Sequence, residues 1–262
     1  MKLRLIQIDT FTDKVLGGNP AAVCPLTEWL SVSVMQAIAA ENNLSETAFF
    51  VPNKNGGYDL RWFTPNVEVG LCGHATLAAG DVVLTDIQPD ADAVTFETKS
   101  GPLIVSRSGD NLQMDFPARP AAPYDAPKFL LTGLGAEPAE VLAGDDYVAV
   151  YDSAAEVAAL VPNFAGLCQL DRRGVVATAP GDDSETDYVL RFFAPKNAVP
   201  EDPVTGNVQT ELVPYWSERL GKNRLNVRQL SARGGLMTCE ARGERVAISG
   251  QCVRFLDGEL SL

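Results

Sequence analysis

Histidine is nearly missing from this sequence: His74 is the only one among 262 residues. That scarcity excludes a histidine-rich metal site and any mechanism that needs two imidazoles. Cysteine is also sparse, with five residues and no Cys-x-x-Cys pair, so zinc and thioredoxin-type sites lack support and reduced thiols are expected. No apolar run approaches the roughly 20 residues of a membrane helix. We expect a cytoplasmic protein.

Basic residues are outnumbered, 21 Lys and Arg against 34 Asp and Glu, for a formal net charge of −13. A surface so acidic repels phosphate backbones and anionic membranes, so we expect neither nucleic acid nor membrane as a partner. It also does not attract anionic substrates at long range. A bound acid has to be held by local dipoles, such as the unpaired N–H groups at helix N-termini.

Sequence motifs for the common cofactor and nucleophile sites are also missing. The chain has no G-x-G-x-x-G, P-loop or G-x-S-x-G pattern and no lysine in an obvious Schiff-base context. Hydrophobic residues make up 46% of the chain, which is typical of a folded protein, and its length fits two domains.

The second half of the chain resembles the first. Arg61–Pro65 (RWFTP) returns as Arg191–Pro195 (RFFAP), 130 residues later. Each copy is followed by a glycine-containing loop, at Gly70–Gly73 and Glu201–Gly206, and then by a helix candidate. Short strands at hairpin spacing follow both helices. We predict an α+β protein of two similar halves with a cleft between them, into which both helix N-termini point.

The helix predicted after Cys72 is apolar on every side, so we expect strands to wrap it. A second helix is predicted over Ser31–Glu41. Three prolines in Pro117–Pro123 make this segment the best linker candidate, since proline cannot join a central strand. We therefore predict an N-terminal lobe over residues 1–118, with the end of the chain as a candidate completion, and a C-terminal lobe over 119–262.

Three residues are candidates for acid–base chemistry, and each has a plain structural alternative. Glu46 shares a strand face with apolar residues, where desolvation raises a carboxyl pKa and suits proton transfer; alternatively it is solvated at a strand mouth. His74 follows a glycine at a helix start and either serves a substrate or bonds a backbone carbonyl. Asp202 is either their partner across the cleft or an ordinary turn residue before proline.

Cys72 supports a second hypothesis. A thiol in this loop resembles the cysteine bases of cofactor-free epimerases, but the matching loop Pro200–Val208 offers no second cysteine. Without that second cysteine, an amino-acid racemase or epimerase is kept as the alternative among enzymes rather than as the main hypothesis. A non-catalytic protein that binds a small acid is the alternative outside them.

Four segments, in order along the chain, resemble the PhzF-like phenazine biosynthesis family. They are Gly17–Val23 (GGNPAAV), Asn43–Phe49 (NLSETAF), Gly70–Thr76 (GLCGHAT) and Pro200–Gly206 (PEDPVTG). Arg233–Gly235 and Gly258–Leu260 also fit the family pattern. The resemblance covers nearly the whole chain, and four ordered motifs are more specific than any one of them.

The resemblance implies a diaminopimelate-epimerase-like fold: two pseudo-symmetric domains, each a barrel-like sheet wrapped around a central helix. It also implies an isomerase that shifts a proton and a double bond in a small carboxylic acid without a cofactor or metal, and a homodimer. By motif position the catalytic residues are Glu46, His74 and Asp202. Asn19, Ser45 and the backbone amides of Gly73 and Gly206 complete the implied substrate site.

One departure affects specificity. The family often has Gly-Ser-Ala-His after the second loop, whereas this chain has Gly206-Asn207-Val208-Gln209. The amide of Asn207 replaces a serine hydroxyl; it still donates hydrogen bonds but is larger. We include Asn207 among the substrate-binding residues and expect a substrate that differs from that of the phenazine enzyme.

Overall fold

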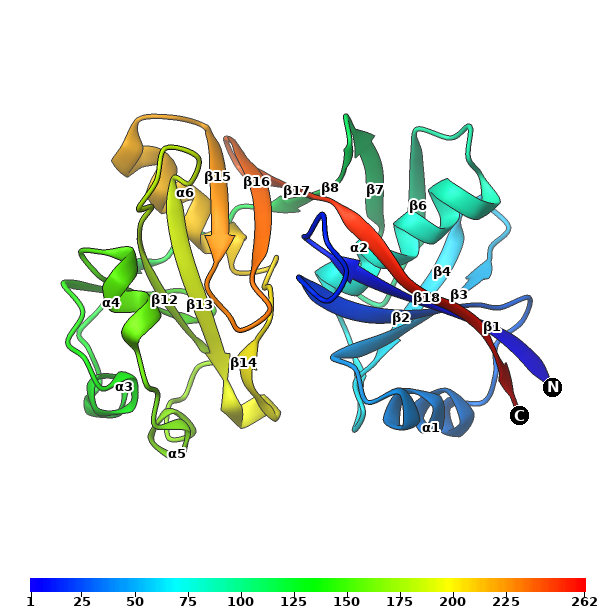
Figure 1. Cartoon of the computed structure of the whole chain (residues 1–262), viewed down its shortest axis with the longest axis horizontal. Helices are drawn as coiled ribbons and strands as arrows, with labels where there is room; N and C mark the ends of the chain where they lie inside the picture. The colour runs from blue at the N-terminus through cyan, green and yellow to red at the C-terminus, as the bar shows by residue number, and fades with distance from the viewer. The chain divides into compact units, whose positions relative to one another are not determined.

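The computed structural model describes residues 1–262 and divides into two compact units. Unit 1 comprises Met1–Asp115 and Ser249–Leu262, and unit 2 comprises Phe116–Ile248. Each is a sheet with a helix packed against it (Figure 1). No helix is long and apolar enough to cross a membrane.

Unit 1 is built on a sheet whose central strands are almost entirely buried. β1 is antiparallel to β2 and to β18, β2 is parallel to β3, and β3 is antiparallel to β4. β4 is antiparallel to β5 and parallel to β6, and the meander β6–β7–β8 follows. The strands are β1 (Lys2–Thr10), β2 (Asn19–Pro25), β3 (Glu46–Pro52), β4 (Tyr58–Phe63), β5 (Glu68–Val69), β6 (Ala93–Glu97), β7 (Leu103–Ser108), β8 (Asn111–Pro117) and β18 (Cys252–Ser261).

The helices of unit 1 confirm two predictions. α1 (Val32–Asn42) begins where Ser31 accepts a hydrogen bond from the Val34 N–H and ends at Asn43, which adopts the left-handed conformation. α2 (Gly73–Val82) is buried along almost its whole length and continues as the π-helical turn η1 (Val83–Ile87). It packs against β1, β2, β3 and β7, as expected of a helix that is apolar all round.

Unit 2 repeats this plan. Its strands are β9 (Ala122–Pro123), β10 (Glu140–Ala143), β11 (Tyr147–Val150), β12 (Val175–Pro180), β13 (Tyr188–Ala194), β14 (Val199–Asp202), β15 (Arg224–Gln229), β16 (Gly235–Arg242) and β17 (Arg245–Gly250), the last of which extends into unit 1. Its helices are α3 (Lys128–Leu134), α4 (Ala154–Ala159), α5 (Phe164–Leu167), the 3₁₀ turn η2 (Pro195–Asn197) and α6 (Gln209–Leu220).

The pairing order of the strands is the same in the two units. Successive strands of β10–β11–β12–β13 pair antiparallel, parallel and antiparallel, as those of β1–β2–β3–β4 do. β13 is antiparallel to β14 and parallel to β15, just as β4 is antiparallel to β5 and parallel to β6. The predicted repeat falls on β4 and β13. Arg61 forms a two-pronged salt bridge with Glu68, and Arg191 forms the same bridge with Glu201. These matches identify a duplicated structural plan.

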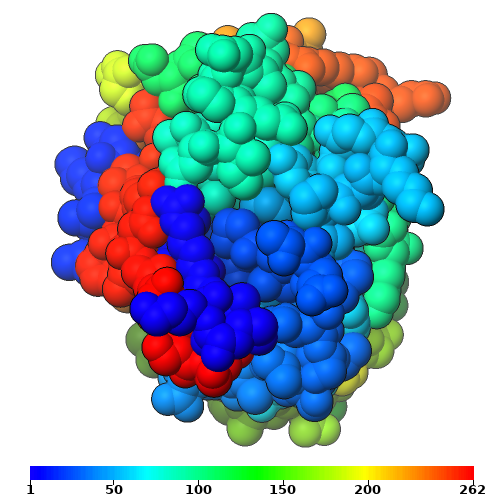
Figure 2. Space-filling view, turned by 90° about the vertical axis from the view of Figure 1, so that its right-hand side faces the viewer, coloured from blue at the N-terminus to red at the C-terminus, as the bar shows by residue number.

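The end of the chain belongs to unit 1. β18 runs antiparallel to β1 from Cys252 to Ser261, with one irregularity beside Gln7. Figure 2 shows the first and last segments of the chain side by side on the surface of unit 1. In the proline-rich segment, Ala122 and Pro123 form a two-residue strand at the edge of β10, where the missing proline N–H is tolerated.

Candidate active site

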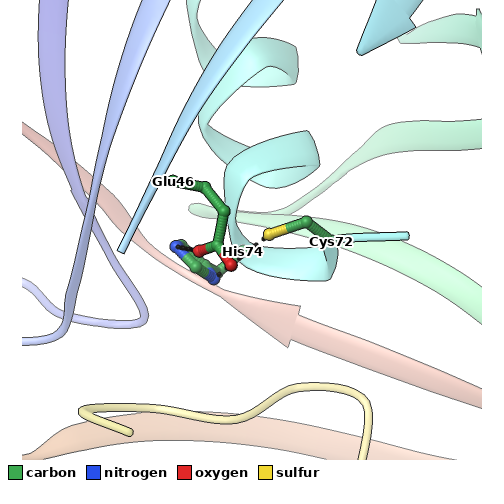
Figure 3. Close-up of side chains that lie close together, drawn as sticks. All are labelled: Glu46, Cys72 and His74. Atoms are coloured by element: carbon green, nitrogen blue, oxygen red, sulfur yellow. Dashed lines mark hydrogen bonds and ion pairs between the residues drawn. The ribbon is translucent and has the colours of Figure 1, made fainter. Parts of the chain in front are cut away.

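Three side chains of unit 1 meet where β3 begins and α2 begins (Figure 3). Glu46 is the first residue of β3, and His74 is the second residue of α2. The Glu46 Oε2 atom lies 3.2 Å from His74 Nε2, and Cys72 Sγ lies 3.5 Å from His74 Nδ1. The imidazole therefore stands between a carboxylate and a thiol, with one ring nitrogen toward each.

Burial determines the charge of this imidazole. It lowers the pKa of His74 to about 4, and a hydrogen bond with the Pro20 backbone only partly opposes the shift. At neutral pH the ring is neutral and carries one N–H. The Pro20 carbonyl accepts that N–H, so the 3.2 Å approach of Nε2 to Glu46 Oε2 is a close polar contact rather than a hydrogen bond. The Glu46 side chain is 18% exposed, compared with 8% for His74, so it is the more exposed side chain of the pair.

These three residues also offer one metal-ligand atom each, all within 4.8 Å of one another. The two short contacts use opposite nitrogens of the same ring, however, and one ion binds only one of them. An ion bound through one ring nitrogen would therefore replace one of these two contacts.

Asn19 and Ser45 lie at the same end of the sheet. β2 begins at Asn19 and runs parallel to β3, and the Ser45 hydroxyl donates to Asn19 Oδ1 at 3.2 Å. The loop before Asn19 is fixed by Asp9, whose Oδ2 accepts from the Leu16 N–H at 2.7 Å. Gly18 has φ +59°, and a Cβ there would lie 2.0 Å from the Thr10 carbonyl oxygen, so only glycine fits.

In unit 2, a buried glutamine organises the loop that carries Asp202. Gln229, fully buried in β15, donates to the Asp202 carbonyl at 2.8 Å and accepts from the Thr205 N–H at 2.8 Å. The Thr205 hydroxyl donates to Asp202 Oδ2, and the Ser231 hydroxyl donates to the Pro203 carbonyl at 2.6 Å. The Asp202 carboxylate is therefore held in a defined position.

This loop leads into α6. The N–H of Gln209 donates to the Gly206 carbonyl at 3.0 Å and is the first to bond within the turn. The backbone N–H groups of Gly206 and Asn207 precede that turn, which is the position that favours an anion. With its amide oxygen toward Arg173, the Asn207 side chain accepts hydrogen bonds from that guanidinium.

The structure therefore gathers the sequence-predicted residues into two groups. Unit 1 holds Asn19, Ser45, Glu46, Gly73 and His74, and unit 2 holds Asp202, Gly206 and Asn207. Sequence reasoning missed Gln229 and Arg173, which hydrogen-bond to residues of the second group. In β15, Gln229 falls on the same face as the apolar residues Leu225 and Val227, and this period of two was the sequence signal that its side chain points inward.

Comparison with known proteins identifies the family. The model of the family described as phenazine biosynthesis-like protein (PhzC-PhzF) matches residues 8–258. A curated protein of Pseudomonas aeruginosa, named an uncharacterized isomerase, is 51% identical over 262 residues and is covered over 100% of both chains. A crystal structure of a PhzF family protein from Enterococcus faecalis superposes with a TM-score of 0.96 at 41% identity and 100% coverage of both chains.

More distant structures share the fold alone. A hydroxyproline epimerase from Agrobacterium vitis has a TM-score of 0.59 at 10% identity, covering 100% of this chain and 93% of its own. The expected diaminopimelate-epimerase-like α+β fold is thus confirmed, as is the resemblance drawn from the four motifs. The chain belongs to the phenazine biosynthesis-like (PhzC-PhzF) family and is an enzyme of the isomerase class.

Proposed function

We propose that this isomerase moves a proton within a small cyclic or amino carboxylic acid, without a cofactor, and that Glu46 takes and returns the proton. One observation carries the proposal: the carboxylate of a partly exposed glutamate faces a buried, neutral imidazole at 3.2 Å. A neutral imidazole does not form an ion pair with a carboxylate, so Glu46 retains its capacity as a base.

In this proposal the substrate carboxylate is held by backbone amides. Gly73 opens α2 and Gly206 precedes α6, so both lie where helix dipoles favour a negative charge. This answers the problem posed by the net charge of −13, because the anion is bound without a basic patch. We further propose that Asp202, fixed by Thr205 and Gln229, serves the reaction as a second polar group.

Solvent exchange tests the proposal. A panel of cyclic unsaturated acids and amino acids is incubated with the enzyme in D₂O, and deuterium incorporation is followed by NMR and mass spectrometry. The wild type is expected to label at least one acid, and Glu46→Gln to lose roughly 10²–10⁴-fold in rate, as is typical for general acid–base groups. Glu41→Gln, on the exposed side of α1, is the matched control. Equal labelling by Glu46→Gln and wild type would reject Glu46 as the base.

The position of Cys72 favours a second candidate function, an amino-acid racemase or epimerase. Its sulfur lies 3.5 Å from His74 Nδ1, so the thiol is placed to exchange a proton with the ring. This candidate predicts that labelling accompanies inversion at a stereocentre and that Cys72→Ala is inactive. A shift of a double bond with full activity in Cys72→Ala would eliminate it.

A further inference from the structure

The guanidinium of Arg173 links two segments of unit 2. Its Nε donates to Asp146 Oδ1 at 3.1 Å, and its Nη2 donates to Asp146 Oδ2. Asp146 is fully buried, between β10 and β11, and Arg173 is its charge partner. The guanidinium also lies over the Phe192 ring, 5.7 Å from its centroid, which limits its rotation.

The same guanidinium faces Asn207 in the loop before α6. Nη1 and Nη2 both donate to the Asn207 amide oxygen, the second at 3.2 Å. Arginine has no acceptor atom, so only the oxygen of the amide is compatible with this contact. The amide nitrogen is then turned away from Arg173, on the side where the opposite orientation would place the oxygen against acceptor atoms.

We propose that Arg173 is a positioning residue that makes Asn207 a hydrogen-bond donor to the substrate carboxylate at the start of α6. The inference rests on the proposed function, in which the amide of Gly206 binds that carboxylate. It adds a specificity device. The rigid series Asp146–Arg173–Asn207 holds an amide N–H₂ where the family often has a serine hydroxyl, which donates or accepts according to its rotation.

The plainer alternative is that Arg173 only neutralises Asp146. The substitution Asn207→Asp separates the two, because aspartate has nearly the size of asparagine. It keeps an oxygen toward Arg173 but places a second oxygen where the N–H₂ was. If Asn207 is a donor to a carboxylate, this exchange replaces an attraction by a repulsion between like charges while the link to Arg173 is retained.

Acetate, the smallest organic carboxylate, is the probe, with acetamide as the neutral control. The full-length ¹⁵N-labelled protein is titrated to 200 mM acetate, and the Gly206 amide and the Asn207 side-chain N–H₂ are followed by NMR. We expect both signals to shift along one binding curve with acetate and not with acetamide. Asn207→Asp should weaken acetate binding roughly tenfold or more, as for loss of one charge-assisted hydrogen bond, with no loss of thermal stability.

The outcomes separate this inference from the proposed function. A shift at Gly206 without one at Asn207, or unchanged acetate affinity in Asn207→Asp, overturns the inference and leaves the proposed function standing. No shift at either Gly206 or Gly73 rejects the anion-binding loops and both proposals. Arg173→Lys keeps a charge for Asp146 but loses the fork, so the Asn207 response to acetate should fade while that of Gly206 remains; a full Asn207 response in this variant also overturns the inference.

Discussion

The two units follow one plan but differ at the positions that carry the chemistry. In unit 1, Thr47 of β3 pairs with Phe63, and in unit 2, Val175 of β12 pairs with Phe193. Glu46 comes just before Thr47 and Gly174 just before Val175, so Glu46 and Gly174 occupy equivalent positions. A Cβ on Gly174 would lie 2.5 Å from Phe192 Cζ, so no side chain fits there. Duplication thus supplied two scaffolds, and only unit 1 has room for an acid at this position.

The loops before α2 and α6 also differ, in the residue that follows the glycine. Unit 1 places His74 after Gly73, within 3.2 Å of Glu46, whereas unit 2 places Asn207 after Gly206, in contact with Arg173. An imidazole has a nitrogen that can accept a proton, whereas an amide has no comparable basic atom. We infer that proton transfer belongs to unit 1 and that the loop of unit 2 contributes mainly binding and orientation.

The largest difference in stability should come from the paired arginines. Arg191 donates to Glu201 and also to the Leu160 carbonyl at 2.8 Å and the Val157 carbonyl at 3.2 Å, whereas Arg61 bonds Glu68. Because the pair is half-buried, Arg191→Met should cost less than the ~3–5 kcal/mol of a fully buried ion pair, and Arg61→Met should cost less again. Urea denaturation measures both. Equal losses would mean that the carbonyl contacts contribute nothing.

Glu211, in the first turn of α6, should make stability depend on pH. Burial, with repulsion from Asp146 and Asp145, raises the pKa of Glu211 to about 7. The folded protein then holds this proton more tightly than the unfolded chain, so stability falls as pH rises from about 4.5 to 7. The loss amounts to at most about 3 kcal/mol.

Glu211→Gln removes this titration and is the variant that tests it. Its free energy of unfolding should exceed that of the wild type at pH 8 and approach it at pH 5. Parallel pH profiles for the two proteins would contradict the assignment.

The steric difference between the units can be tested at Gly174 itself. Gly174→Ala meets Phe192 and the Phe193 carbonyl and should cost about 1–3 kcal/mol, as overpacking does. Gly70→Ala, whose nearest neighbour is Ser100 Oγ at 3.8 Å, is the matched control in unit 1 and should be close to neutral. A tolerated Gly174→Ala would show that steric exclusion does not separate the two positions.

The smallest effect concerns helix caps. Ser153 begins α4 with a full capping box, in which Glu156 also bonds back, whereas Ser31 begins α1 with a single bond to Val34. Ser153→Ala should cost about 1 kcal/mol and Ser31→Ala somewhat less. Thermal unfolding of both variants makes the comparison, and the reverse order would reject it.

The sequence predicted what depends on local pattern. The period of α1, the all-round apolarity of α2 and the repeat at Arg61 and Arg191 were visible because neighbouring residues determine them. The contacts of Gln229 and Arg173 were not, because their partners lie 24 to 34 positions away and depend on strand pairing. The pairing of β18 with β1 joins residues about 250 positions apart, beyond any local signal.

The sole histidine allows a direct test of the account. The Cε1–H signal of His74 can be followed by NMR from pH 3.5 to 8 without interference from any other imidazole. A neutral ring that faces the Glu46 carboxylate predicts a pKa of about 4 and no titration above pH 6. A pKa of 6.5 or higher would show an imidazolium paired with Glu46 and would contradict the proposed base.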